Sequence, residues 1–348
     1  MDTATLAIEP LDIRSASDAE LAFAHDFFSK MRAERHPHDT PIPFEEDLAR
    51  WRSLPPFVQL TSYTAWDPDH TALVALGTVV IINMEENRHL AQVELEVLPE
   101  YRQQGLGKRL LGLLAEVAER EGRTLMLIGT HGRILAGEAF MERLGAHRGL
   151  ESHTNQLDLR DLDRGLLQRW LDQAASLADD FELGLWEGEY PESQMDEIAA
   201  LYEVMNSQPR GTLQAEDVHF TPEQVRHMQA QILSTGGDHW TLYVRDRATG
   251  ALAGFTDVVW NPNRPELLQQ GNTGVFPQYR NRGLGRWLKA AMLDKTLRER
   301  PQVRYVRTHN ADSNAAMLRI NHELGFKPYS SSAMWQVETA RALDYARS

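Results

Sequence analysis

An internal repeat constrains the fold of this chain more than any other feature of its sequence. Residues 99–107, PEYRQQGLG, recur as residues 277–285, PQYRNRGLG, with six of nine positions identical at an offset of 178 residues. Two further matches keep almost the same offset: Gly77 with Gly254, and the Leu-Gly pair at 144–145 with the pair at 324–325. Collinear matches at one period indicate a duplicated domain. The 348 residues are long enough for two domains, each with its own core.

Both copies are predicted to contain the same order of elements. Apolar, β-branched segments precede the shared motif, an amphipathic helix follows it, and another apolar segment and a second helix come next. The expected strands are 73–83, 89–98 and 124–128 in the first copy, and 240–244, 253–260 and 303–308 in the second.

This order predicts an α/β (α+β) protein with two tandem domains, each a mixed, mostly antiparallel twisted sheet flanked by helices. We expect the domains at residues 1–150 and 181–348, with a linker helix within residues 151–180.

The shared motif places a Gly-x-Gly pair between a strand and the first turn of a helix. That turn offers unpaired N–H groups and a partial positive charge. Glycines also let an anion approach the backbone without a Cβ in the way, so a pyrophosphate is the expected ligand. Neither copy fits a P-loop, and Leu110 and Leu288 replace the third glycine of the dinucleotide-binding fingerprint.

Val-x-Pro followed by Arg-x-x-Gly-x-Gly resembles the acetyl-CoA signature of the GNAT N-acetyltransferase superfamily. The resemblance covers both halves of the chain, and the tandem arrangement is similar to that of mycothiol synthase. It implies that the loop amides hold the CoA pyrophosphate, that the preceding strand end pairs with the pantetheine arm, and that acetyl-CoA is the co-substrate without a metal. The implied cofactor contacts are Val275, Phe276, Arg280, Asn281, Arg282, Gly283, Leu284, Gly285, Arg286, Asn310 and Asn314 in the second copy, and Val97, Arg102, Gln103, Gln104, Gly105, Leu106, Gly107 and Lys108 in the first.

The second copy keeps more of the family's pattern. In the family, an Asn at the position of Asn314 opens the next helix and contacts the pantetheine arm, whereas the first copy has Ile134 there. Asn310 and Asn314 each carry a donor and an acceptor suited to the pantetheine amides, although an Asn at a helix start also serves as a simple cap. We therefore expect acyl transfer in the C-terminal domain, and leave cofactor binding by the first domain open.

The family's usual acid, a tyrosine that protonates the leaving thiolate, is missing from both copies. Met141 and Asn321 stand at that position. Tyr329 is a candidate substitute, or else a packed aromatic side chain. Gln269 and Asn272 belong to a polar strand typical of a hydrogen-bonding cleft, where water could carry the proton.

The catalytic candidates are therefore Gln269, Asn272 and Tyr329. In the first copy, Glu94 and Glu96 alternate with apolar residues and should point away from the apolar face of their strand. The second copy has no carboxylate at the aligned positions, so no general base is assigned.

Composition excludes several other classes of function. A net charge of −14 without a long Lys/Arg run argues against a nucleic-acid partner. The longest mostly apolar stretch, residues 71–84, is too short to span a bilayer, so no membrane partner is expected. The absence of cysteine excludes disulfides and thiolate metal sites and is compatible with the cytoplasm, where we expect the protein.

Two functions fit these residues. The first is an acyltransferase that moves an acetyl group from acetyl-CoA to a primary amine of a small molecule or peptide. The second is a CoA-binding regulatory or scaffold protein whose transferase chemistry has lapsed, because the usual acid is absent. Retention of the glycine loop together with Asn310 and Asn314 favours the enzyme. The sequence identifies neither the acceptor nor the oligomeric state.

Overall fold

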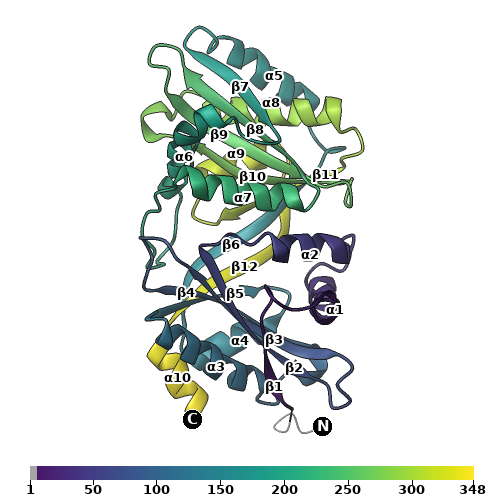
Figure 1. The fold of residues 1–348 in the computed structure, drawn as a ribbon. Helices are drawn as coiled ribbons and strands as arrows, with labels where there is room; N and C mark the ends of the chain where they lie inside the picture. The colour runs from purple at the N-terminus through teal and green to yellow at the C-terminus, as the bar shows by residue number, and fades with distance from the viewer. Residues whose placement is uncertain (1–5) are drawn as a thin grey trace. The chain divides into compact units, whose positions relative to one another are not determined.

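The computed structural model describes residues 6–348 and divides into two compact units (Figure 1). The first unit runs to Glu151 and also contains Arg210–Glu216 and Ser331–Ser348, whereas the second contains Ser152–Pro209 and Asp217–Ser330. Both units are sheets flanked by helices, as the repeat predicts. No helix within the described residues is both long and apolar enough to cross a membrane.

The sheet of the first unit is antiparallel except for one parallel pair, β4 with β5. Its strands are, in order across the sheet, β1 (Ile8–Leu11), β2 (Val58–Trp66), β3 (Leu73–Ile82), β4 (Leu90–Val97), β5 (Leu125–His131) and β12 (Lys327–Glu338). Its helices are α1 (Asp18–Arg35), α2 (Phe44–Arg52), α3 (Leu106–Arg120), α4 (Leu135–Leu144) and α10 (Thr339–Arg347).

The second unit repeats this pattern, with β10 and β11 as its parallel pair. Its strands are, in order across the sheet, β6 (His147–Asp158), β11 (Tyr305–Ala311), β10 (Leu267–Val275), β9 (Leu252–Trp260), β8 (Asp238–Asp246) and β7 (Phe181–Glu187). Its helices are α5 (Arg164–Ala175), α6 (Met195–Tyr202), α7 (Pro222–Ser234), α8 (Leu284–Glu299) and α9 (Ala315–Glu323).

One strand of each sheet comes from the other half of the sequence. β6 follows α4 along the chain, yet its Ser152–Asp158 segment pairs with β11. β12 follows α9, yet its Ser332–Glu338 segment pairs with β5 (Figure 1). The helices that follow these strands go with them, so α5 packs on α8 and α10 packs on α3.

This exchange makes the units differ from the boundaries expected at 1–150, 151–180 and 181–348. The helix expected within 151–180 forms as α5, but it belongs to the core of the second unit. The last 18 residues belong to the first unit. Hydrophobic periodicity shows that a segment is a strand, but not which sheet the strand joins.

Alternate residues of β3 bury two different layers of the first unit. Val79 and Ile81 pack with the apolar face of α3, and Val74 and Leu76 pack with α1. β3 is therefore covered by helices on both faces.

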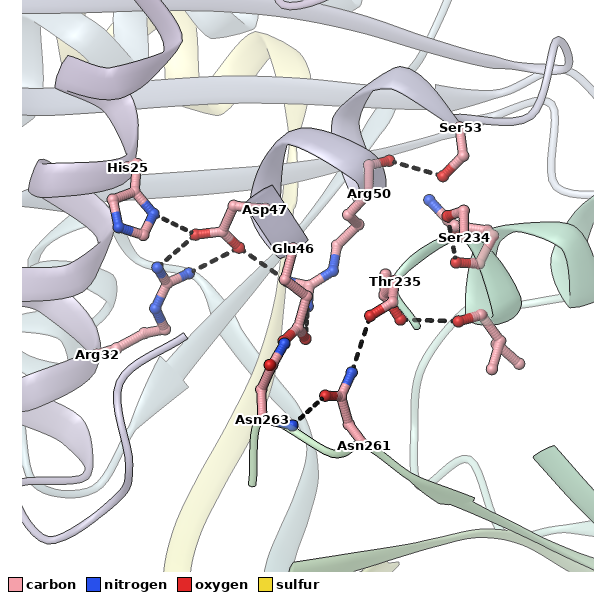
Figure 2. A network of polar contacts seen from close by, with 12 residues as sticks. His25, Arg32, Glu46, Asp47, Arg50, Ser53, Ser234, Thr235, Asn261 and Asn263 are labelled. Atoms are coloured by element: carbon pink, nitrogen blue, oxygen red, sulfur yellow. Dashed lines mark hydrogen bonds and ion pairs between the residues drawn. The ribbon is translucent and has the colours of Figure 1, made fainter. Parts of the chain in front are cut away.

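Buried carboxylates tie α1 to α2 (Figure 2). The Asp47 side chain is 1% exposed, and it accepts hydrogen bonds from His25 Nδ1 at 2.9 Å and Arg32 Nη2 at 2.5 Å. The adjacent Glu46 pairs with Arg50 at 3.3 Å. Because an unpaired buried carboxylate is strongly unfavourable, these contacts fix α1, which lines the cavity described below.

Candidate active site

The two Gly-x-Gly loops have the same backbone conformation. Gln103 and Asn281 adopt left-handed φ angles of 60° and 62°, and Gly105 and Gly283 adopt 84° and 87°. A Cβ added at Gly105 would meet no atom within 4 Å, so glycine is needed there for the left-handed backbone and not for space. Each of these glycines is the N-cap of the following helix, α3 or α8. Both loops therefore aim unpaired helix N–H groups at a place suited to an anion.

The arginine of each motif holds the loop against the end of the preceding strand. Arg102 Nε donates to the Val97 carbonyl at 2.9 Å, and Arg280 Nε donates to the Val275 carbonyl at 3.0 Å. The rest of the Arg102 guanidinium forms a bidentate pair with Glu34. These contacts give both arginines a role in shaping the loop, and their contact with a cofactor stays a prediction.

Several other residues that the resemblance implied are engaged within the protein. Leu106 and Leu284 are buried in the cores, so only their backbone can face a ligand. Gln104 donates to the Glu100 carbonyl at 2.8 Å. Arg282 lies over the Phe181 and Tyr279 rings, Arg286 pairs with Glu323 at 2.9 Å, and Phe276 packs against the core near α6.

The central strands separate beside each loop. β4 and β5 are paired only from Leu90 to Val93 on one strand and from Leu125 to Ile128 on the other. In the second unit, β10 and β11 are paired only as far as Gln270 and Thr308. Beyond these points, backbone groups that would have bonded across the parallel pair are left to face a gap in the sheet.

A cavity of about 680 Å³ occupies this gap in the first unit. It is bounded by the ends of β4 and β5, the glycine loop, α1, α4 and α10. Residues of the motif that line it are Val97, Arg102, Gln103, Gly105, Gly107 and Lys108. The first copy thus brings most of its sequence-predicted cofactor residues around one cavity. Apolar side chains form much of the remaining wall, among them Leu95, Ile128, Ile134 and Phe140.

The charge of the cavity lining is opposite to that of the whole chain. Its side chains include Arg35, Arg102, Lys108 and Arg143, against one carboxylate, Glu96, although the net charge of the protein is −14. A cationic lining beside helix N–H groups suits a polyanionic ligand.

β4 carries two carboxylates, of which Glu96 lines the cavity and Glu94 does not. Glu96 pairs with Arg35 of α1, and its Oε2 is buried without a hydrogen-bond partner among the described residues. Glu94 lies two residues earlier on the same face of the strand. Burial, and then the Glu96 charge, raise the pKa of the Glu94 carboxyl, and Arg35 opposes them; the Glu94 residue is nevertheless exposed to solvent.

His131 ends β5 in the wall of the cavity, and its ring stands perpendicular to that of His36 with centroids 5.0 Å apart. Burial, and then the nearby His36, lower the pKa of His131 to about 4. Nδ1 accepts the Arg133 backbone N–H at 3.3 Å, so the proton of the neutral ring belongs on Nε2. That nitrogen is buried without a partner among the described residues, as an unused donor.

The asparagines of the second unit that the resemblance assigns to the pantetheine arm, Asn310 and Asn314, are hydrogen-bonded within the protein. Asn314 caps α9 by accepting from Met317 N at 3.3 Å, as the sequence allowed. Asn310 Oδ1 accepts from Asn321 Nδ2 at 2.8 Å, where the family has its tyrosine. In the first unit, Ile134 starts α4 without any side-chain cap.

The catalytic residues expected from the sequence lie in the second unit. Gln269 is exposed on β10. Asn272 belongs to an irregularity in the pairing of β10 with β9, and its carbonyl accepts from Thr256 Oγ1 at 3.4 Å. The Tyr329 ring lies at the start of β12, with the Arg307 guanidinium 3.9 Å from its centroid. The catalytic role of these three residues stays a prediction.

The sequence missed the residues that enter the first cavity from distant parts of the chain. Arg35 and Met31 come from α1, and Tyr345 comes from α10. His131 could have been found from the repeat, because it aligns with His309, whose pKa burial also lowers. Tyr345 could not have been found in this way, because it lies in the cavity only since β12 and α10 join the first unit.

Comparison with known proteins identifies the class. Residues 22–146 match the model of the acetyltransferase (GNAT) family. The chain is 25% identical to a tandem GNAT protein from the clavulanic acid biosynthesis pathway, with a TM-score of 0.75, and the match covers 96% of this chain and 98% of that one. A GCN5-related N-acetyltransferase from Sphaerobacter thermophilus shares the fold at 16% identity and a TM-score of 0.64, covering 95% and 96% of the two chains. No curated protein matches the sequence.

The first copy therefore matches the acetyltransferase (GNAT) family, and the whole chain shares its fold with a tandem GNAT protein; together these matches support acyltransferase activity. The family model matches the first copy, whereas the sequence pattern had favoured the second. The resemblance and the predicted fold class are confirmed.

Proposed function

We propose that the first unit binds acetyl-CoA and that the protein transfers the acetyl group to a primary amine. The observation that carries this proposal is the cavity at the separated ends of β4 and β5, lined by the glycine loop and by cationic side chains. Its chemistry fits CoA: helix N–H groups and Lys108 for phosphates, free strand edges for the pantetheine amides, and an apolar wall near Ile128 and Ile134.

When bound, the CoA thioester supplies an activated acyl group. The chain holds it by the loop amides of α3 and by the edge of β4 beyond Val93, whose N–H groups can also stabilise the developing oxyanion. The amine approaches from the side of α1, because Arg35 and Glu96 line that part of the cavity.

Glu94 takes the proton from the attacking amine on this proposal. A carboxyl with a raised pKa is a better proton acceptor near neutral pH than an ordinary one. Burial is the first cause of that raised pKa and the Glu96 charge is the second, whereas Arg35, which pairs with Glu96, opposes them. The solvent contact of Glu94 allows it to pass the proton to water.

Acyl transfer in the second unit, as expected from the sequence, is the competing location. The matching loop geometry and the retained Asn314 cap favour it. Two contacts in the second unit argue for the first unit instead, because they occupy groups expected to meet the cofactor. They are the ion pair of Arg286 with Glu323 and the hydrogen bond of Asn321 to Asn310.

A matched pair of variants decides between the two units. Gly107→Glu places a carboxylate in the first loop, where an added Cβ has only ordinary contacts, 3.9 Å from Phe140 and Val97. Gly285→Glu makes the same change in the second loop, where the Cβ lies 3.4 Å from Ile320. Acetyl-CoA binding is measured by titration calorimetry, and turnover by thiol release across a panel of amines. The chain contains no cysteine, so it adds no thiol background.

We expect Gly107→Glu to abolish binding and turnover, and Gly285→Glu to change either by less than about 3-fold, because only the first change puts a negative charge beside the pyrophosphate. Loss of acetyl-CoA binding and turnover in Gly285→Glu alone would instead indicate that the active site lies in the second unit. Normal acetyl-CoA binding without turnover on any amine would instead support the alternative of a CoA-binding regulatory or scaffold protein.

A further inference from the structure

The end of the chain reaches the CoA cavity of the first unit. α10 follows the exchanged strand β12, and its Tyr345 lines the cavity beside the glycine loop. The Phe140 ring of α4 meets Tyr345 edge-on, with centroids 5.9 Å apart and an interplanar angle of 87°.

Three contacts hold α10 in place. Arg341 Nε donates to the Leu144 carbonyl at the end of α4 at 3.0 Å, and Thr339 Oγ1 donates to the Arg123 carbonyl at 2.7 Å. At Gly112, α3 and α10 approach so closely that an added Cβ would lie 3.0 Å from Ala346 Cβ. The helix is thus packed against its neighbours, and the position of Tyr345 is fixed.

One cation, Lys108, lies beside the Tyr345 ring without a carboxylate partner among the described residues. Lys108 Nζ lies 5.3 Å from the ring centroid and 3.4 Å from Ser348 Oγ. Arg143 also lines the cavity. The other two basic residues of the lining, Arg35 and Arg102, are neutralised by Glu96 and Glu34. An unpaired positive charge, that of Lys108, therefore lies beside the Tyr345 ring.

We propose that α10 completes a subsite for the 3′-phosphoadenosine end of CoA, with Tyr345 stacking on the adenine and Lys108 binding the 3′-phosphate. A planar ring beside an unpaired cation fits a base that carries a phosphate. This inference rests on the proposed binding of acetyl-CoA and deepens it, because it assigns the recognition of the nucleotide to the last residues of the chain.

The test uses the full chain, titrated with acetyl-CoA and with 3′-dephospho-acetyl-CoA. Tyr345→Leu keeps an apolar contact with Phe140 but removes the ring, and Tyr345→Phe restores the ring. Lys108→Met removes the cation, and Arg347→Met removes an exposed cation of α10 that does not line the cavity. Circular dichroism and the melting temperature establish that each variant is folded.

Tyr345→Leu is expected to weaken both ligands about 10-fold, with recovery in Tyr345→Phe, because stacking does not depend on the 3′-phosphate. Lys108→Met is expected to weaken acetyl-CoA about 10-fold and the dephospho form less than about 2-fold, whereas Arg347→Met leaves both within about 2-fold. Unchanged affinity in folded Tyr345→Leu, or equal losses for both ligands in Lys108→Met, would overturn this subsite. If the wild-type protein binds neither ligand, the proposed function itself fails.

Discussion

Lys289 is buried in the second unit, and its replacement by leucine should stabilise the protein in a pH-dependent way. The residue is 1% exposed on α8, and its Nζ lies 5.7 Å from the centroid of the Phe326 ring. At the repeat offset of 178 residues, the first unit has Leu111, which is fully buried. Leucine therefore suits this position in the fold, and the change removes only the amine.

The size of the effect follows from the pKa of Lys289. Burial lowers it from 10.5 to about 7, although the Asp257 carboxylate opposes that shift. Between these two values the unfolded chain holds more protons than the folded one, so the stability of the wild-type protein rises with pH. The lowered pKa corresponds to a cost of about 4 kcal/mol at pH 7 and about 2 kcal/mol at pH 9.

Guanidinium unfolding of the wild type and Lys289→Leu at pH 7 and pH 9 measures this difference. The variant should be more stable at pH 7, and its advantage should shrink by about 2 kcal/mol at pH 9. Lys295→Leu is the matched control on the same helix, because Lys295 pairs with Glu299 at 2.6 Å and with Glu187. That change should destabilise the protein without the same pH dependence. An advantage of Lys289→Leu that is equal at both pH values would refute the reasoning.

Four further outcomes are expected. Asp47→Ala should destabilise the protein by about 3–5 kcal/mol in denaturant titrations, because it leaves buried partners unpaired, whereas the exposed Asp18→Ala should cost under about 1 kcal/mol. Glu94→Gln should lower kcat/KM for the amine about 10²-fold at pH 7 with acetyl-CoA affinity unchanged, and an unchanged rate would remove Glu94 as the base. The pKa of His131 is about 4 in the folded protein and 6.5 in the unfolded chain, so between these pH values the unfolded chain binds more protons. The stability of the protein should therefore fall as the pH falls from 6.5 toward 4, and His131→Phe should reduce that fall in unfolding experiments. Tyr329→Phe should reduce turnover less than about 10-fold, and a loss of about 10³-fold would identify Tyr329 as the acid.

Local chemistry made much of the fold predictable. The strand expected at 253–260 differs from β9 by one residue, and the strand expected at 73–83 differs from β3 by one residue. The glycine loops, their left-handed residues and the helices that they open follow from the repeated motif. These features depend on residues close together in the sequence, where periodicity and backbone preference act directly.

The candidate site was less accessible from the sequence. The comparison of Asn314 with Ile134 favoured the second unit, but it could not show that Asn310 is already bonded to Asn321. The opening lined by Arg35 and Tyr345 depends on contacts between segments far apart in the chain. A single sequence gives each residue's chemistry, whereas the groups left free for a ligand are known only after the others have paired.

The exchange of β6 and β12 sets the order of events during synthesis. Thr130 of β5 accepts a hydrogen bond from Trp335 of β12, a residue 205 positions later. At about 5–20 residues per second, β5 leaves the ribosome roughly 10–40 s before that partner is made. During this interval β5 presents an unpaired edge, which is the kind of surface that recruits other strands. The cavity of the first unit is therefore complete only after β12 and α10 have been made, and a nascent chain that stalls before them would lack the wall made by Tyr345.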